Sequence, residues 1–191
     1  MSAFSDYLDL RTAVVEMVGD AGIADVFDRL TKLAEARFNR DLRTRFQVSQ
    51  VTLTVSDGIA ALPGDFAEAI GVYDAQGREY IGQTLQMQRT GRSYYALDGS
   101  LLRGPDGDVA IEYYAKIPTL TERMEASNWL LEQYPDAYLY GVSVEAAKYR
   151  RDVDSARALE AMREMAVSDI RADDSRARYS RARVRVKGPT P

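Results

Sequence analysis

Apolar residues recur every three to four positions over the first 45 residues of the chain, which is the spacing of a helix with one buried face. A first stripe follows Ser5 and Asp6, which suit a helix start, and the sequence GDAG at residues 19–22 ends it. A second stripe begins almost at once, so the two predicted helices should pack antiparallel. The expected buried positions are Leu10, Val14, Met17 and Val18 in the first helix, and Ile23, Phe27, Leu30, Ala34, Phe38 and Leu42 in the second.

Helical spacing returns after residue 127, in the aromatic stretch NWLLEQYPDAYLYG. Pro135 lacks an amide hydrogen and disfavours helical geometry at Tyr134, so it divides a short helical segment from a new helix that begins at the proline. Core packing around a hinge explains this stretch better than a ligand-binding aromatic box. The expected buried faces are Tyr138, Val142, Ala146 and Tyr149 in this helix, and Ala156, Leu159, Met162, Ala166 and Ile170 in a last helix capped by Asp152.

Between these helical regions the apolar period changes to two residues, as in a β-strand. The sequence VTLTV, the turn SDG and the returning IAALP predict a hairpin. Further on, SYYAL and SLLRG flank Asp98-Gly99, a favoured two-residue hairpin loop. The run VAIEYYAKI follows, and we expect it to complete a three-stranded meander with those two strands.

The order of helices, strands and helices predicts an α+β fold, in which the N- and C-terminal helix pairs form a bundle and a β-hairpin and meander insertion projects from it. We expect a single domain over residues 1–174. Its parts are helices at 1–45, a β-rich insertion at 46–118 and helices at 119–174. Residues 175–191 are predicted to form an extended basic C-terminal arm, because the apolar periodicity of the last helix stops there.

Charge separates this arm from the rest of the chain. Residues 175–191 contain no acid and carry a net charge of +6, whereas residues 1–174 carry 19 basic and 29 acidic residues, a balance of −10. The arm is expected to bind a carboxylate-rich groove on a neighbouring molecule, ordering on contact. A solvated tail with no partner and a DNA-binding tail are the alternatives, and the second lacks a stacking platform. The candidate contact residues are Arg176, Arg178, Tyr179, Arg181, Arg183, Arg185 and Lys187.

Two tyrosine pairs in the β-rich region each place one ring on either face of a sheet, because neighbouring side chains of a strand alternate. The pairs are Tyr94 with Tyr95, and Tyr113 with Tyr114. Core packing of one ring and exposure of the other is the expected arrangement. Since exposed tyrosines are enriched at interfaces, Tyr94 and Tyr114 are candidates for contact with another subunit or partner.

The chain has no cysteine and no histidine, which excludes disulfides, thiolate or imidazole metal sites and histidine-activated nucleophiles. Chemistry based on paired carboxylates remains, but pairs such as Glu122 and Glu125 are expected by chance among 29 acids. We therefore assign no catalytic, metal-binding or cofactor-binding residue. No apolar run reaches the roughly 18 residues of a membrane span, and the acidic start of the chain does not suit a signal peptide, so synthesis in a cytoplasm without membrane contact is expected.

Three segments together resemble the head-to-tail adaptor proteins of tailed bacteriophages, the connector subunits that bind beneath the portal. They are LAEARFNRDLRTR at residues 33–45, LPGDFAEAIGVY at 62–73, and the stretch from YYALDGSLLRG at residue 94 through VAIEYYAKIPTLTE to NWLLEQYPDAYLYGVSVEAAKYRRD, which ends at residue 152. Each motif alone is weak, but their order and spacing cover about residues 26–170.

The resemblance implies a noncatalytic structural protein of the virion, located at the head-tail junction and assembled in the host cytoplasm. Such subunits form a ring, by family a homo-dodecamer, under the portal protein. The ring continues the DNA channel without specific DNA binding and offers an attachment site for downstream tail or nozzle proteins. A carboxylate-dependent cell-wall glycan hydrolase and an unrelated interaction domain with a basic arm are the alternative interpretations.

Overall fold

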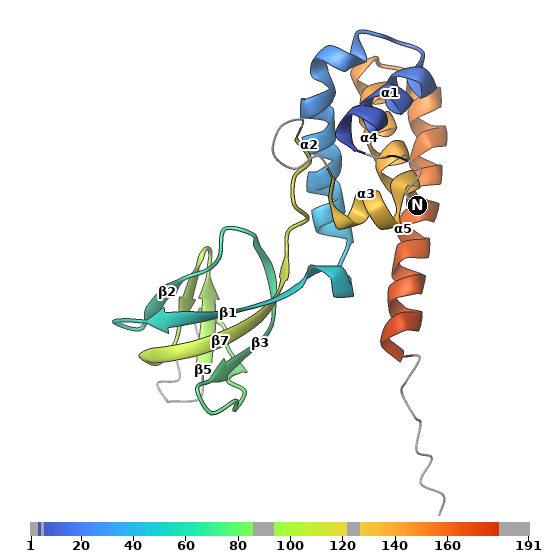
Figure 1. Cartoon of the computed structure of the whole chain (residues 1–191). Helices are drawn as coiled ribbons and strands as arrows, with labels where there is room; N and C mark the ends of the chain where they lie inside the picture. The colour runs from blue at the N-terminus through green and yellow to red at the C-terminus, as the bar shows by residue number, and fades with distance from the viewer. Residues whose placement is uncertain (1–3, 5, 86–93, 122–126, 180–191) are drawn as a thin grey trace, which may run out of the picture. The chain divides into compact units, whose positions relative to one another are not determined.

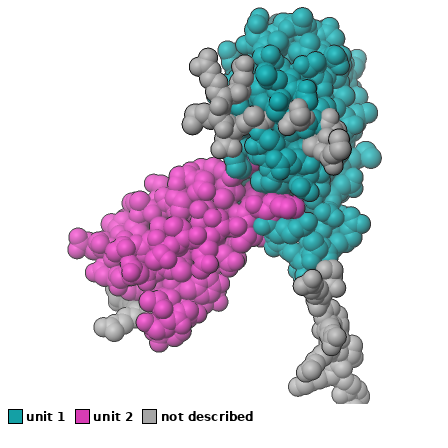
Figure 2. Space-filling model, viewed as in Figure 1, with its two compact units in different colours: residues 1–45, 118–191 teal, residues 46–117 magenta. Residues whose placement is uncertain are grey.

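In a computed structural model, the described part of the chain comprises residues 4, 6–85, 94–121 and 127–179. The chain divides into two compact units, one made of residues 1–45 and 118–191 and the other of residues 46–117 (Figure 2). The described residues form five α-helices and two β-sheets, so the predicted α+β class is confirmed. Whether both units belong to a single folding domain stays a prediction.

The first unit is helical, and α4 lies at its centre (Figure 1). Helix α4 contacts each of the other four helices, and α5 packs along it most extensively. The predicted helix pairs at the two ends of the sequence are both present, and the short helical segment predicted before Pro135 is confirmed as α3. The helices are α1 (Tyr7–Val18), α2 (Ile23–Asp41), α3 (Trp129–Gln133), α4 (Pro135–Tyr149) and α5 (Val153–Tyr179).

The local signals at the N-terminus act as predicted. Asp6 caps α1, because its carboxylate accepts hydrogen bonds from the backbone amides of Leu8 at 2.8 Å and Asp9 at 3.1 Å. Gly19 ends the helix in the left-handed region, with φ of 68°, where a glycine has no steric penalty. All six positions of the predicted α2 stripe are buried, which confirms the helical spacing read from the sequence.

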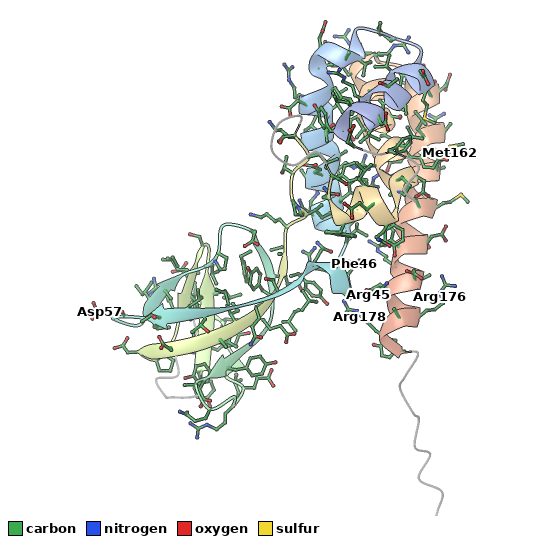
Figure 3. The ribbon with its side chains drawn as sticks, viewed as in Figure 1. Arg45, Phe46, Asp57, Met162, Arg176 and Arg178 are labelled. Atoms are coloured by element: carbon green, nitrogen blue, oxygen red, sulfur yellow. The ribbon has the colours of Figure 1, made fainter. Side chains whose placement is uncertain are left out.

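Three residues predicted to be buried are exposed instead. Met17, Tyr149 and Met162 are 43%, 57% and 47% exposed, respectively (Figure 3 labels Met162). In α5 the buried position next to Met162 is occupied by Arg163, which is only 4% exposed. Its guanidinium group pairs with Asp41 and with Glu160, so the buried charge is not left unpaired.

The second unit contains two sheets, ordered β1-β7-β3 and β2-β6-β5-β4. All strand pairs are antiparallel except β4 with β5. One core cluster includes Val109 and Ile111 from the first sheet and Ala60 and Leu102 from the second. The strands are β1 (Val48–Val55), β2 (Ile59–Ala61), β3 (Phe66–Asp74), β4 (Ile81–Gly82), β5 (Tyr94–Asp98), β6 (Leu101–Arg103) and β7 (Gly107–Ala115), and a 3-10 turn at Arg45–Gln47 precedes β1.

Strand pairing departs from the prediction at two places. The Asp98-Gly99 hairpin is confirmed, since β5 pairs with β6, but β7 does not continue it as a meander and pairs with β1 and β3. The expected hairpin of β1 and β2 is reduced to a bridge between Ser56 and Ile59. The nine residues of β7 find long partners in β1 and β3, with eight and nine residues, whereas β6 has only three.

Among the described residues, no helix has the length and hydropathy of a membrane span. Within the same residues there is no group of three or more acids arranged to hold a metal ion.

Candidate functional site

The C-terminal end of α5 carries the first residues of the basic arm. Helix α5 begins after Asp152, whose carboxylate accepts a hydrogen bond from the Ser155 amide at 3.1 Å. The helix then continues to Tyr179, so residues 175–179 are helical and not extended as predicted. The helix is favoured here because Asp173 and Asp174 lie three and four residues before Arg176 and Arg178, respectively, a spacing that pairs opposite charges on a helix.

Asp174 is the most buried charged group at this end of α5, at 6% exposed. Its Oδ1 atom accepts a hydrogen bond of 2.8 Å from the backbone amide of Arg45, and its Oδ2 atom lies 2.6 Å from Nε of Arg178. Arg45 also places its guanidinium group 3.6 Å from the same carboxylate. Asp174 therefore connects the end of α5 to the residue at which the chain leaves the helical unit.

Asp173 makes a second set of contacts beside the first. The Tyr134 hydroxyl donates a 2.7 Å hydrogen bond to its Oδ2 atom, and Arg45 lies 3.6 Å from that atom. The hydrogen bond from Tyr134 lowers the pKa of Asp173, and the neighbouring Arg45 lowers it further. Burial, together with donation to Asp173, raises the pKa of Tyr134 to about 12. We call Arg45, Tyr134, Asp173, Asp174 and Arg178 the arm-root cluster.

The arm-root cluster engages one of the predicted arm residues and leaves others exposed (Figure 3 labels Arg45, Arg176 and Arg178). Arg178 is held by Asp174, while the Arg176 side chain is 77% exposed and lies 3.7 Å from Asp173. Tyr179 is 71% exposed. The other predicted contact residues, Arg181, Arg183, Arg185 and Lys187, lie outside the described residues. The role of Asp173 and Asp174 was missed from the sequence, although their spacing from the arginines was a detectable signal.

Tyr94 and Tyr114, the two other predicted contact residues, lie in different sheets of the second unit. Tyr94 begins β5, and Tyr114 is near the end of β7, opposite Val48 of β1. Both are partly buried, whereas Tyr113 is 4% exposed and donates a 3.1 Å hydrogen bond to Asp65. The structure does not bring Tyr94 and Tyr114 together in one sheet, and their contact with a partner stays a prediction.

The aromatic stretch at residues 128–141 is held by a buried polar network. Asn128 caps α3, because its side-chain oxygen accepts hydrogen bonds from the amides of Leu130 and Leu131. Its amide nitrogen donates to the Tyr138 hydroxyl at 2.8 Å, and that hydroxyl donates to Glu35 at 3.0 Å. Leu130, Leu131 and Tyr138 are fully buried, which confirms their predicted core role.

Comparison with known families identifies a relationship that covers nearly the whole chain. The sequence model of the SU10 adaptor protein family matches residues 5–187, a range that includes both compact units and the basic residues of the arm. No curated protein matches the chain.

Proposed function

Because this chain belongs to the SU10 adaptor protein family, a family of structural proteins of bacteriophages, we propose that it is a head-to-tail adaptor of a tailed phage or phage-like particle. Its subunits form a ring under the portal, extend the DNA channel and present an attachment site for tail or nozzle proteins. A homo-dodecamer at the head-tail junction, assembled in the host cytoplasm, is the expected form. The family match over residues 5–187 is the observation that carries this proposal.

The charge distribution supports a conduit that does not retain DNA. Contacts between phosphates and Lys or Arg supply most of the nonspecific affinity of proteins for DNA. Residues 1–174 have a net charge of −10, which repels a duplex wherever the acids face a channel. The net positive charge lies after residue 174, in the arm, where it can serve a protein contact.

The arm-root cluster supports a docking role for the arm. Asp174 holds both Arg45 and Arg178, so the arm leaves the helical unit from a defined place on α5. Because one end of the arm is already fixed, the arm loses less conformational freedom when it binds. We propose that residues 180–191 attach the subunit to the portal or to a neighbouring subunit in the ring.

Co-sedimentation with purified portal rings tests this role. We expect the full chain to sediment with portal, and a chain truncated after Tyr179 to bind more weakly because it loses four basic residues. The matched control replaces Arg181, Arg183 and Arg185 with lysine, which retains the charge, and should lose less affinity than the truncated chain. Undiminished binding after truncation would rule out docking of the arm to the portal, and failure of the full chain to bind portal would contradict the adaptor assignment.

A further inference from the structure

Strand β1 is an edge strand with a long outer side. All eight residues of β1, Val48–Val55, pair with β7, and β1 is an outer strand in the order β1-β7-β3. Within the described part of the chain, the backbone pairing recorded next to its outer side is the bridge between Ser56 and Ile59. An exposed strand edge is a template for pairing with another chain, and proteins commonly protect such edges.

The direction of the backbone groups on β1 follows from this bridge. Ser56 and Ile59 exchange two hydrogen bonds, at 3.0 and 3.1 Å, so the backbone groups of Ser56 point to the outer side. Backbone groups alternate sides along a strand, and the β1-β7 register has no bulge. The amide and carbonyl groups of Thr54, Thr52 and Gln50 therefore point outward as well, away from β7.

The two faces of the sheet next to this edge differ in chemistry. On the exposed face, a shallow groove contains the carboxylates of Asp108 and Glu112 from β7; Asp74 also lines this groove, but its carboxylate already pairs with Arg78 at 2.7 Å. On the opposite face, the partly buried Val51 and Leu53 pack against the core cluster. A strand added at this edge thus finds carboxylates on one face and apolar side chains on the other.

The arm sequence has the matching pattern, alternating basic and apolar residues over seven positions. The basic positions are Arg181, Arg183, Arg185 and Lys187, and the apolar positions are Ala182, Val184 and Val186. A period of two places the two kinds on opposite faces of an extended segment. We propose that residues 181–187 of one subunit bind as an added strand along the outer edge of β1 in a second copy of this chain.

This arrangement satisfies backbone groups and charges together. Main-chain hydrogen bonds to Gln50, Thr52 and Thr54 supply affinity, as in other cases of strand addition. The basic side chains lie on the face of Asp108 and Glu112, which are roughly 10 Å from the added backbone because neighbouring strands are about 4.8 Å apart. Extended arginine and carboxylate side chains cover that distance. Seven arm residues also match the eight residues of β1.

The second copy is the occupant because a ring presents the same β1 edge on every subunit, and a head-to-tail contact repeated around a ring closes it. This inference rests on the proposed adaptor ring. It adds the acceptor surface for the arm, which the adaptor role alone does not specify.

Cysteine cross-linking between two full-length variants tests the proposal, since the chain has no natural cysteine. One variant carries Gln50→Cys, and the other carries a single cysteine at one position of the arm. Opposed residues on one face of paired strands have Cβ atoms about 5 Å apart, close enough for a disulfide after small adjustment. We expect mixed disulfide dimers from Arg181→Cys, Arg183→Cys or Arg185→Cys, and little from Ala182→Cys or Val184→Cys, with or without portal rings.

Equal yields at alternate arm positions, or no mixed dimer under either condition, would overturn the proposal. A chain carrying both cysteines that closes only an intramolecular bond would show that the arm occupies its own β1, and the second copy would then be wrong as the occupant. If the full chain does not co-sediment with portal rings but the cross-links form, the proposed function alone is wrong. If the full chain co-sediments with portal rings but the cross-links do not form, this inference alone is wrong.

Two further variants separate strand addition from simple charge attraction. Adding Thr52→Pro to the Gln50→Cys chain removes an outward amide without removing a β7 hydrogen bond, so cross-linking should be lost, whereas Thr52→Val should retain it.

Exchanging two arm residues, Val184→Arg with Arg185→Val, keeps composition and charge but breaks the alternation, and should also abolish the cross-link. An unchanged yield after this exchange means that charge alone holds the arm, and the added strand is wrong. Unfolding midpoints check that each variant folds.

Discussion

Glu35 is an acidic side chain enclosed in the helical unit, at 2% exposed. Its Oε1 atom accepts hydrogen bonds from the Leu120 amide at 2.8 Å and from the Tyr138 hydroxyl. Burial raises the pKa of Glu35 from 4.5 to about 7, although these hydrogen bonds oppose the increase. One carboxyl group thus links α2 to the segment that enters the unit at Leu120 and to the first turn of α4.

We predict that Glu35 makes stability depend on pH. Because its folded pKa lies above its unfolded value, the protonated carboxyl contributes stability that is fully present below about pH 4.5 and is lost as pH rises through about 7. Urea unfolding at pH 5 and pH 8 measures the effect. Between pH 5 and pH 8, the free energy of unfolding of the natural chain should fall by on the order of 3 kcal/mol relative to that of the Glu35→Gln variant. A constant difference between the two proteins would contradict the assigned pKa.

At the scale of the element, α5 shows how far sequence reasoning extends. Its existence and its start after Asp152 were predictable from local spacing, but its buried face was only partly so: Ala166 and Ile170 are buried as predicted, whereas Met162 is exposed. The ion-pair partner of Arg163 in α2 lies 122 residues away in sequence, and this long-range pair makes an arginine acceptable where Met162 was expected. The pairing of β7 was predicted wrongly for a similar reason. The alternation of its side chains was clear from the sequence, but its partner strands, β1 and β3, are distant in the sequence.

The end of α5 provides a second prediction. Asp174→Ala should destabilise the chain by about 2 to 3 kcal/mol, because the substitution leaves the amide of Arg45 and the side chain of Arg178 without a buried acceptor. Hydrogen exchange in the last turn of α5 should increase at the same time. Arg157→Ala is the matched control on the same helix, since its pair with Asp154 is exposed, and it should change stability by no more than about 0.5 kcal/mol. Similar effects of both substitutions would contradict an anchoring role for Asp174.

The arm itself illustrates what the sequence could and could not provide. Its charge was evident from the run of arginines without acids, and so was a contact role. The contact between Asp174 and Arg45 required the tertiary arrangement, because these residues are 129 positions apart, whereas the helical continuation to Tyr179 left a local signal in the spacing of Asp173 and Asp174 from Arg176 and Arg178. The outer edge of β1, which among the described residues carries only the bridge from Ser56 to Ile59, was equally hidden, since the expected hairpin with β2 would have covered it.

At the scale of the whole molecule, the chain combines a helical unit, a unit of two sheets and a terminal basic segment, all within the range matched by the adaptor family. An acidic body with a basic arm suits a subunit that binds proteins at its end and leaves DNA unbound. In the proposed assembly each unit has a distinct part: the helical unit fixes the start of the arm, and the sheet unit of a second copy supplies the edge that receives it.

Electron microscopy of purified portal rings mixed with the full chain tests the proposed adaptor function. We expect a closed ring of this chain on one face of the portal, coaxial with the portal channel, with density from the end of each α5 reaching a neighbouring β1 edge. Portal rings that remain bare at saturating concentrations of the chain would contradict the adaptor function.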